Sequence, residues 1–93
     1  MKEKLTFTLF TLHRKLPPVE CDSIKLSIAD SVSGKFSGSY GIRKGHAKAI
    51  LALAPGKISV SLDGREIFSA ESQGGFAMVE NNEVRVIADG TDI

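Results

Sequence analysis

Cys21, His13 and His46 are the side chains whose types could supply a nucleophile with its base, or ligands for a metal ion. Nucleophilic catalysis requires a thiol and an imidazole that meet in space, with a third group orienting the base. A structural zinc site requires four cysteine or histidine ligands at close intervals. The three residues are scattered along the chain and match neither pattern. We therefore expect no catalytic residue, no metal and no cofactor, and a packing role for Cys21.

A polar segment containing three glycines, Gly34, Gly38 and Gly41, has a superficial likeness to a phosphate-binding loop. A P-loop places Ser or Thr after its Gly-Lys pair, whereas Phe36 follows Gly34-Lys35 here. The dinucleotide fingerprint also fails, because the glycine spacing differs and no helix is expected to follow. The sequence therefore predicts no nucleotide site of either kind.

Nucleic-acid binding would need aromatic platforms within a strongly positive field. Phe36, Tyr40 and Phe76 could stack on bases, but basic residues do not interleave with them. The chain carries twelve Lys and Arg against eleven Asp and Glu, which is close to neutral. We expect no nucleic-acid partner, and we expect most aromatic residues in the core, with Tyr40 and Phe36 as exceptions.

Alternating apolar and polar residues predict the strands that would position these side chains. Leu5–Leu9, Ser23–Ile28 and Lys57–Leu62 alternate with the period of a half-buried strand. Arg65–Gln73, Phe76–Glu80 and the stretch from Val84 to Ala88 continue the pattern. Short strands at regular spacing predict an all-β fold, an antiparallel sandwich or barrel.

Turn residues separate these strands. Asp63-Gly64 is a strong hairpin signal, because a type I′ turn needs positive φ at both central residues. Asn81-Asn82 tolerates the same geometry, and Gly74-Gly75 indicates a bulge or a close backbone approach. Asp30–Ser39 has no periodicity and is expected to be a loop that is a candidate for function. His46–Ala54 favours helix by local propensity, although strands surround it.

Length and composition predict one small domain covering residues 1–93. A single cysteine excludes a disulfide-stapled scaffold, and no apolar run approaches the length of a transmembrane helix. No secretory signal pattern is present at the start of the sequence, which favours the cytoplasm.

Two stretches are similar to the N-terminal β-sandwich of the epsilon subunit of rotary F-type ATP synthases. The first is Tyr40-Gly-Ile-Arg-Lys-Gly-His46-Ala, followed by Leu53-Ala-Pro-Gly56. The second is Phe68-Ser-Ala-Glu-Ser-Gln-Gly-Gly75-Phe-Ala-Met-Val-Glu80-Asn-Asn-Glu-Val-Arg-Val-Ile-Ala-Asp89. Their order and spacing agree with the family over roughly residues 5–89.

The resemblance implies a two-sheet antiparallel sandwich of about ten short strands, with a strand after the His-Ala pair. It implies a non-catalytic central-stalk rotor subunit that binds gamma and contacts the c-ring, coupling ion-driven rotation to ATP synthesis. The expected location is the cytoplasmic side of the bacterial inner membrane, peripheral to it. Contacts to the c-ring would fall on Ser37, Gly38, Ser39 and Tyr40, and contacts to gamma on Thr11, His46 and Leu51.

Departures from the family pattern leave a second hypothesis open. Lys44 and Lys48 replace prolines of the motif, and with Arg43 they are candidates for contacts to carboxylates or polar loops of a partner. The inhibitory C-terminal helical hairpin of the family is expected to be absent, because only Gly90–Ile93 follow Asp89. The alternative function is a stand-alone β-sandwich interaction module with a different partner.

Overall fold

The computed structural model describes residues 4–29 and 36–90, with the backbone alone at residues 36 and 37. These residues form nine strands and no helix. The strands are β1 (Leu5–Phe10), β2 (Val19–Cys21), β3 (Ser23–Ala29), β4 (Phe36–Arg43), β5 (Ala49–Leu53), β6 (Gly56–Leu62), β7 (Arg65–Ser72), β8 (Gly74–Glu80) and β9 (Glu83–Asp89).

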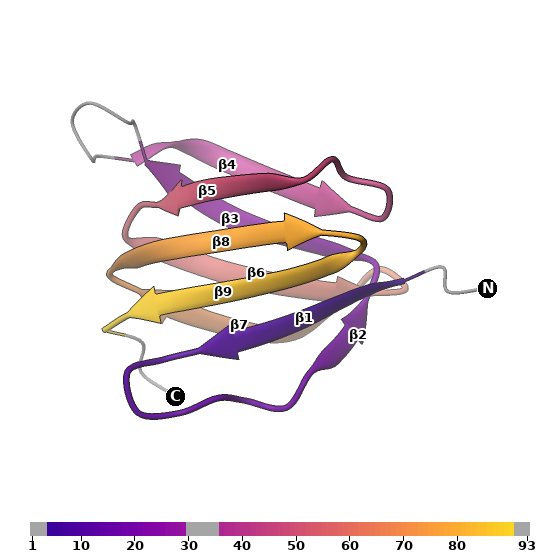
Figure 1. Ribbon diagram of the computed structural model, residues 1–93, viewed down its shortest axis with the longest axis horizontal. Helices are drawn as coiled ribbons and strands as arrows, with labels where there is room; N and C mark the ends of the chain where they lie inside the picture. The colour runs from indigo at the N-terminus through magenta and orange to yellow at the C-terminus, as the bar shows by residue number, and fades with distance from the viewer. Residues whose placement is uncertain (1–3, 30–35, 91–93) are drawn as a thin grey trace.

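The strands form two facing layers (Figure 1). The front layer has the order β2-β1-β9-β8-β5, and the back layer has the order β4-β3-β6-β7. The layers are joined where Leu53 of β5 pairs with Ile28 of β3. The expected all-β sandwich is confirmed. Its detail differs in two respects, since nine strands are described rather than about ten, and β1 pairs with β9 in parallel.

Two tight turns have the backbone geometry that their residues predict. Asp63 and Gly64 have φ values of 54° and 79°, and they connect β6 to β7. Asn81 and Asn82 have φ values of 52° and 62°, and they connect β8 to β9. Positive φ at both central residues matches the right-handed twist of the flanking strands, so both hairpin predictions are confirmed.

The segment with helix-forming residues is strand β5, as the resemblance implied. All five residues from Ala49 to Leu53 pair with Val79 to Gly75 of β8. Helix propensity differs by only a few tenths of a kcal/mol among such residues, and the cross-strand pairing outweighs it.

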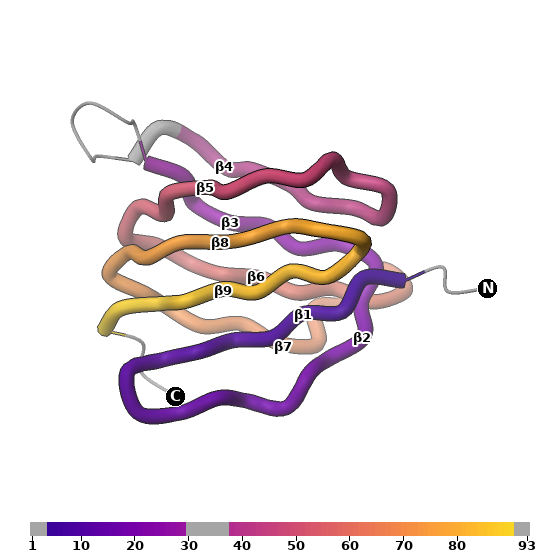
Figure 2. The backbone as a smooth tube through the Cα atoms, in the orientation of Figure 1, coloured from indigo at the N-terminus to yellow at the C-terminus, as the bar shows by residue number. Residues whose placement is uncertain are grey.

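The expected loop over Asp30–Ser39 is wrong at its C-terminal end. Strand β4 begins at Phe36, so Phe36 to Ser39 belong to a strand that pairs with β3. The remaining positions of the expected loop, residues 30–35, lie outside the described residues. Ser and Gly lack the apolar alternation that marks a strand, so the pairing with β3 determines the extended conformation here. Figure 2 shows the backbone of β4 beside that of β3.

The core lies between the layers and consists of inward residues of the long strands. Its largest fully buried members are Phe7, Leu5, Leu9, Ile24, Leu26, Ile42, Ile58, Val60, Val79, Val84, Val86 and Cys21. Tyr40, Leu51, Leu16 and Phe68 pack against this cluster from its margins. The alternating residues of the sequence thus supply most of the core.

Gly75 is a position where two backbones approach closely, as the Gly-Gly pair predicts. Its φ is 136°, and a Cβ there would run into the carbonyl oxygen of Ile87 on the neighbouring strand. Gly75 pairs with Ala88 in the front layer. A side chain at this position is therefore incompatible with the β8–β9 pairing.

Cys21 is fully buried and is expected to be chemically inert in the native state. Burial, with a smaller contribution from Asp22, raises the pKa of its thiol from 9.0 to about 11. Iodoacetamide should therefore modify Cys21 at pH 8 only as fast as the domain unfolds. The unfolded thiol ionises at the lower pKa, so the free energy of unfolding should decrease as pH rises from about 9 to about 11. Rapid native-state alkylation, followed by mass spectrometry, would contradict this assignment.

Candidate protein-binding site

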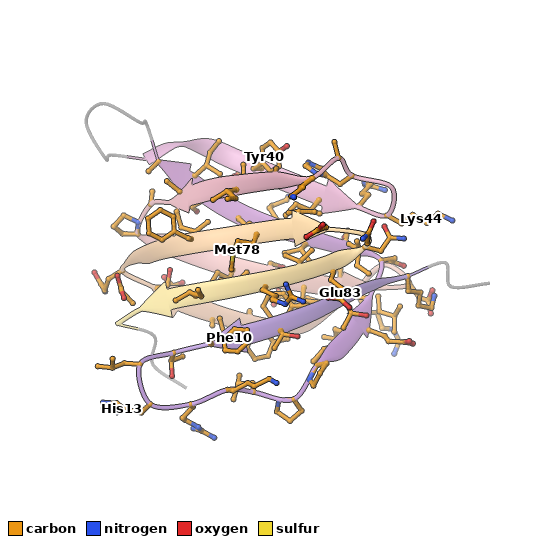
Figure 3. The ribbon with its side chains drawn as sticks, viewed as in Figure 1. Phe10, His13, Tyr40, Lys44, Met78 and Glu83 are labelled. Atoms are coloured by element: carbon orange, nitrogen blue, oxygen red, sulfur yellow. The ribbon has the colours of Figure 1, made fainter. Side chains whose placement is uncertain are left out.

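The outward side chains of the front layer form two rows across four strands. One row runs Ala52, Phe76, Ile87 and Phe10, across β5, β8, β9 and β1. The next row runs Ile50, Met78, Arg85 and Thr8 across the same strands. Figure 3 labels Phe10 and Met78 in this layer. Six of the eight residues are apolar, and we call Phe10, Ile50, Ala52, Phe76, Met78 and Ile87 the apolar face.

Large side chains of the apolar face are exposed. Ile50 is 72% exposed, Phe76 is 55% exposed and Ile87 is 44% exposed. Single exposed apolar residues are ordinary in soluble proteins, but contiguous exposed apolar patches mark interaction sites. Because register places these three side chains in adjacent rows, they form one patch rather than scattered positions.

Charged residues border the apolar face at one end. Glu80 and Glu83 are cross-strand partners in the row beyond Met78 and Arg85. Lys48 Nζ lies 3.8 Å from Glu80, and Arg85 Nη2 donates to Glu83 at 2.8 Å. An apolar centre with a polar, ion-paired rim is the usual anatomy of a protein–protein interface.

The outer face of the back layer is different in character. Its outward positions carry mainly small hydroxyl residues and charges: Ser23, Ser27, Ser39, Ser59, Ser61, Ser69, Lys25, Arg43, Lys57, Glu66 and Glu71. Ser59 donates to Glu66 at 2.6 Å, and this bond, followed by that from Lys57, lowers the pKa of the Glu66 carboxyl. The outer face of the back layer is therefore polar, whereas the outer face of the front layer carries the exposed apolar patch.

His46 lies in the turn between β4 and β5, at one corner of the apolar face. Its Nδ1 lies 2.6 Å from the carbonyl oxygen of Ala47, which can only accept, so Nδ1 carries the proton. The other ring nitrogen, Nε2, lies 2.6 Å from the hydroxyl of Tyr40, and the two rings meet edge to face. Asn82 fixes the same turn from the front layer, since its Oδ1 accepts from the Gly45 N–H at 2.7 Å.

The residues expected to contact gamma lie around the apolar face rather than within it. Thr11 follows Phe10 at the opposite corner from His46, where its hydroxyl accepts from the Arg14 N–H at 3.1 Å. Leu51 lies in β5 between Ile50 and Ala52, and its partly buried side chain packs against the core. The structure thus brings these three positions to the margins of one layer.

The residues expected to contact the c-ring belong to strand β4, not to a turn. Ser37, Gly38, Ser39 and Tyr40 all lie within Phe36–Arg43, and the last three pair with Ile28, Ser27 and Leu26. Ser37, Gly38 and Ser39 lie in this strand rather than in the expected loop, because the pairing with β3 extends further than the polar residues suggest. Ser39 is exposed, whereas Tyr40 is half-buried against the core.

The three basic candidates cluster around the turn after β4. Arg43 ends β4, Lys44 follows it, and Lys48 directly precedes β5. All three side chains are exposed. They can therefore reach carboxylates on a partner.

Cys21, His13 and His46 are the side chains considered for catalysis or metal binding, and the structure describes residues 4–29 and 36–90. Within this part of the chain, no group of three or more His, Cys, Asp and Glu could hold a metal ion. Cys21 is buried in the core, and His13 is exposed in the segment after β1. No helix of the described residues is long and apolar enough to cross a membrane.

Sequence reasoning missed the apolar face, and Phe76 in particular was expected in the core. Phe76 is 55% exposed, which corrects that expectation. Its side chain lies on the opposite face of β8 from the buried side chains of Ala77 and Val79. The available signal was the unbroken apolar run from Phe76 to Val79. A strand that alternates has one buried face, whereas a continuous apolar run indicates apolar residues on both faces.

A β-sandwich with a contiguous apolar patch on one outer face and a polar opposite face has the features typical of a protein-interaction domain. The family model described as "ATP synthase, Delta/Epsilon chain, beta-sandwich domain" matches residues 22–91. The chain therefore belongs to the ATP synthase delta/epsilon family, and the resemblance noted in the sequence is confirmed.

Curated relatives agree with the family match. The ATP synthase epsilon chain of Prochloron didemni is 36% identical over 67 residues, which cover 72% of this chain and 48% of that protein. The ATP synthase epsilon chain of Anaeromyxobacter sp. (strain Fw109-5) is 34% identical over 85 residues, which cover 91% of this chain and 58% of that protein. The chain thus spans about half the length of the curated relatives it matches.

Solved structures share the fold at low sequence identity. A chain in the Euglena gracilis mitochondrial ATP synthase, described as OSCP/F1/c-ring, has a TM-score of 0.82 and 21% identity, covering 99% of this chain and 54% of that chain. A chain in the Tetrahymena thermophila mitochondrial ATP synthase, described as central stalk/c-ring, has a TM-score of 0.72 and 16% identity, covering 98% of this chain and 67% of that chain.

Proposed function

We propose that this chain is the sandwich of a central-stalk epsilon subunit that binds gamma, contacts the c-ring and so couples ion-driven rotation to ATP synthesis. Its role is mechanical rather than catalytic. The observation that carries the proposal is the apolar face, which lies between His46 and Thr11, the positions that the resemblance assigns to gamma.

The apolar face supplies a driving force for the contact with gamma. Removing apolar surface from water contributes roughly 25 cal/mol per Å², so burying side chains as large as Ile50, Phe76 and Ile87 stabilises a complex substantially. The hydrogen bonds of His46 to Tyr40 and Ala47 hold its ring in one orientation before binding. Because the His46 ring is already ordered before binding, less conformational entropy is lost when the complex forms.

Strand β4 is the proposed surface for the c-ring. Ser39 is exposed, and Gly38 beside it has no side chain, so a loop of the ring can approach the backbone closely. Arg43, Lys44 and Lys48 add positive charge near the end of β4. With both contacts in place, the subunit would be peripheral, on the cytoplasmic side of a bacterial inner membrane.

We expect Ser39→Trp to reduce co-purification with the c-ring by about tenfold, because a bulky side chain would separate β4 from the ring. Ser39 is exposed, so the substitution should leave the fold intact. The measurement is recovery of c-subunit with tagged protein from detergent-solubilised membranes, with circular dichroism as the check on folding. Undiminished recovery of c-subunit would remove Ser39 from the contact.

Binding to gamma is tested by titrating purified gamma subunit with this chain in a calorimeter. The proposal expects a one-to-one complex with a negative heat-capacity change, which marks burial of apolar surface. Absence of binding to gamma, together with a fully folded domain, would overturn the proposal and favour the stand-alone interaction module.

A further inference from the structure

Strands β2, β4 and β7 each pair with a single neighbour in the described part of the chain, so each has an open edge. An open edge presents unpaired N–H and C=O groups that can template another strand. Natural sheets protect such edges with very short strands, prolines, charges or bulges. The three edge strands differ in how many of these protective features they have.

Two of the edges are well protected, and the third is protected only at its beginning. Strand β2 has three residues and follows Pro17-Pro18. Strand β7 has an irregular register opposite Val60 and Ser61, and it carries the charges of Arg65, Glu66 and Glu71. Strand β4 is eight residues long, contains no proline, and has Arg43 at its end as its one charged residue. Its register with β3 shifts only at its beginning, between Phe36 and Gly38. The edge from Ser39 to Arg43 is therefore available for pairing.

The alternation of backbone groups identifies which residues of β4 face the open edge. The carbonyl of Ser27 accepts from Ala54 N–H at 2.9 Å, so the backbone groups of Ser27 point away from β4. Its partner Ser39 must then direct its own N–H and C=O to the open edge, and Gly41 does the same two residues on. Arg43, the next in this series, has its carbonyl bonded to the His46 N–H at 3.2 Å rather than to β3.

Positive charge lies along the outward side of this edge. Lys25 and Arg43 are both exposed, and neither forms an ion pair with a carboxylate of the described residues. Lys57, by contrast, lies 3.0 Å from Glu66. Gly41 pairs with Lys25 and has open space where a Cβ would be, so the lysine can extend over it toward an added strand.

We propose that the open edge of β4 binds an extended acidic segment of a partner protein as an added strand. Its backbone pairs with Ser39 and Gly41, its outward carboxylates meet Arg43 and Lys25, and its inward apolar residues cover Tyr40 at the margin of the core. A second copy of this chain is a poorer occupant, because it would bring Arg43 and Lys25 near their own counterparts. The inference goes beyond the proposed function, since it requires neither gamma nor the c-ring. It uses Ser39 and Arg43 of the surface proposed for the c-ring, so the acidic segment and the ring would be alternative occupants of β4.

A capped octapeptide of alternating valine and glutamate tests the proposal, with a valine and lysine octapeptide as its charge control. Titration into the isotopically labelled chain, followed by NMR, should shift the backbone resonances of β4. The acidic peptide should slow hydrogen exchange at the Ser39 and Gly41 amides at least tenfold, and the basic peptide should not. Failure of the acidic peptide to bind at millimolar concentration would overturn the proposal whatever the result with gamma.

Substitutions at Gly41 test how much the backbone N–H of this residue contributes to peptide binding. Gly41→Pro removes an N–H that does not bond to β3 and should weaken peptide binding at least tenfold, whereas Gly41→Ala keeps the N–H and should bind as before. If Gly41→Pro does not fold, Arg43→Glu serves as the second variant. It should bind the valine and lysine peptide more tightly than the valine and glutamate peptide. Unchanged binding in the folded variants would overturn the proposal. Slow hydrogen exchange at the Ser39 and Gly41 amides in a dimer of the chain, with no peptide present, would also overturn the proposal.

Discussion

Ile87→Asp should lower the affinity of this chain for gamma by about 100-fold or more, because an unpaired carboxylate buried in an apolar contact costs several kcal/mol. Ile87 lies in the middle of the apolar face, between Phe76 and Phe10. Its side chain is 44% exposed in the free domain, so the substitution should change the free energy of unfolding by only about 1 kcal/mol. Calorimetric titration of gamma into the variant measures the loss.

Ile67→Asp is the matched control for this experiment. Ile67 is 43% exposed, but it lies on β7 in the other layer. The two variants have the same change of charge and nearly the same exposure, and they differ in the face that they alter. Equal losses of gamma affinity in both would show that net charge, rather than the apolar face, governs binding.

Gly75→Ala should destabilise the fold by about 3 kcal/mol or more, because it combines backbone strain with a steric clash. The φ of 136° disfavours any side chain, and the added Cβ would meet the carbonyl oxygen of Ile87. Relief requires β8 to separate from β9 within the front layer. Urea unfolding monitored by circular dichroism measures the change in free energy.

Gly41→Ala provides the comparison for Gly75→Ala. Gly41 also lies within a strand, but its φ is not in the left-handed region, and no atom lies within 4 Å of the position that an alanine Cβ would occupy. Alanine should therefore change the free energy of unfolding by less than about 1 kcal/mol. Similar unfolding midpoints for the two variants would contradict the close approach at Gly75.

Much of the fold follows from the sequence because the information for it is local. Alternation in Leu5–Phe10 and Glu83–Asp89 specifies a buried face, and Asp63-Gly64 permits one kind of turn. Strands β2 and β4 could not be predicted in this way. Val19–Cys21 is too short to show a period, and the serines and glycines of β4 are extended because β3 pairs with them.

The candidate site was less predictable, since it depends on which side chains share a face. Motif resemblance located His46 and Thr11, which occupy two corners of the front layer. It did not indicate that Ile50 and Phe76 lie on the same outer surface. That relationship comes from the register of β5 on β8, where Ile50 meets Met78 and Ala52 meets Phe76. Register between strands is a tertiary property.

The parallel pairing of β1 with β9 has a consequence for the order in which the domain folds. Thr6 pairs with Glu83 and Phe10 with Ile87, so almost the whole described chain separates the two strands. Contacts between such distant residues carry a large loop-closure entropy and slow the folding of β proteins. During synthesis on the ribosome, Phe7 and Leu9 remain without the neighbours Val84 and Val86 until strand β9 emerges. The front layer, and with it the apolar face, is therefore completed only at the end of translation of this domain.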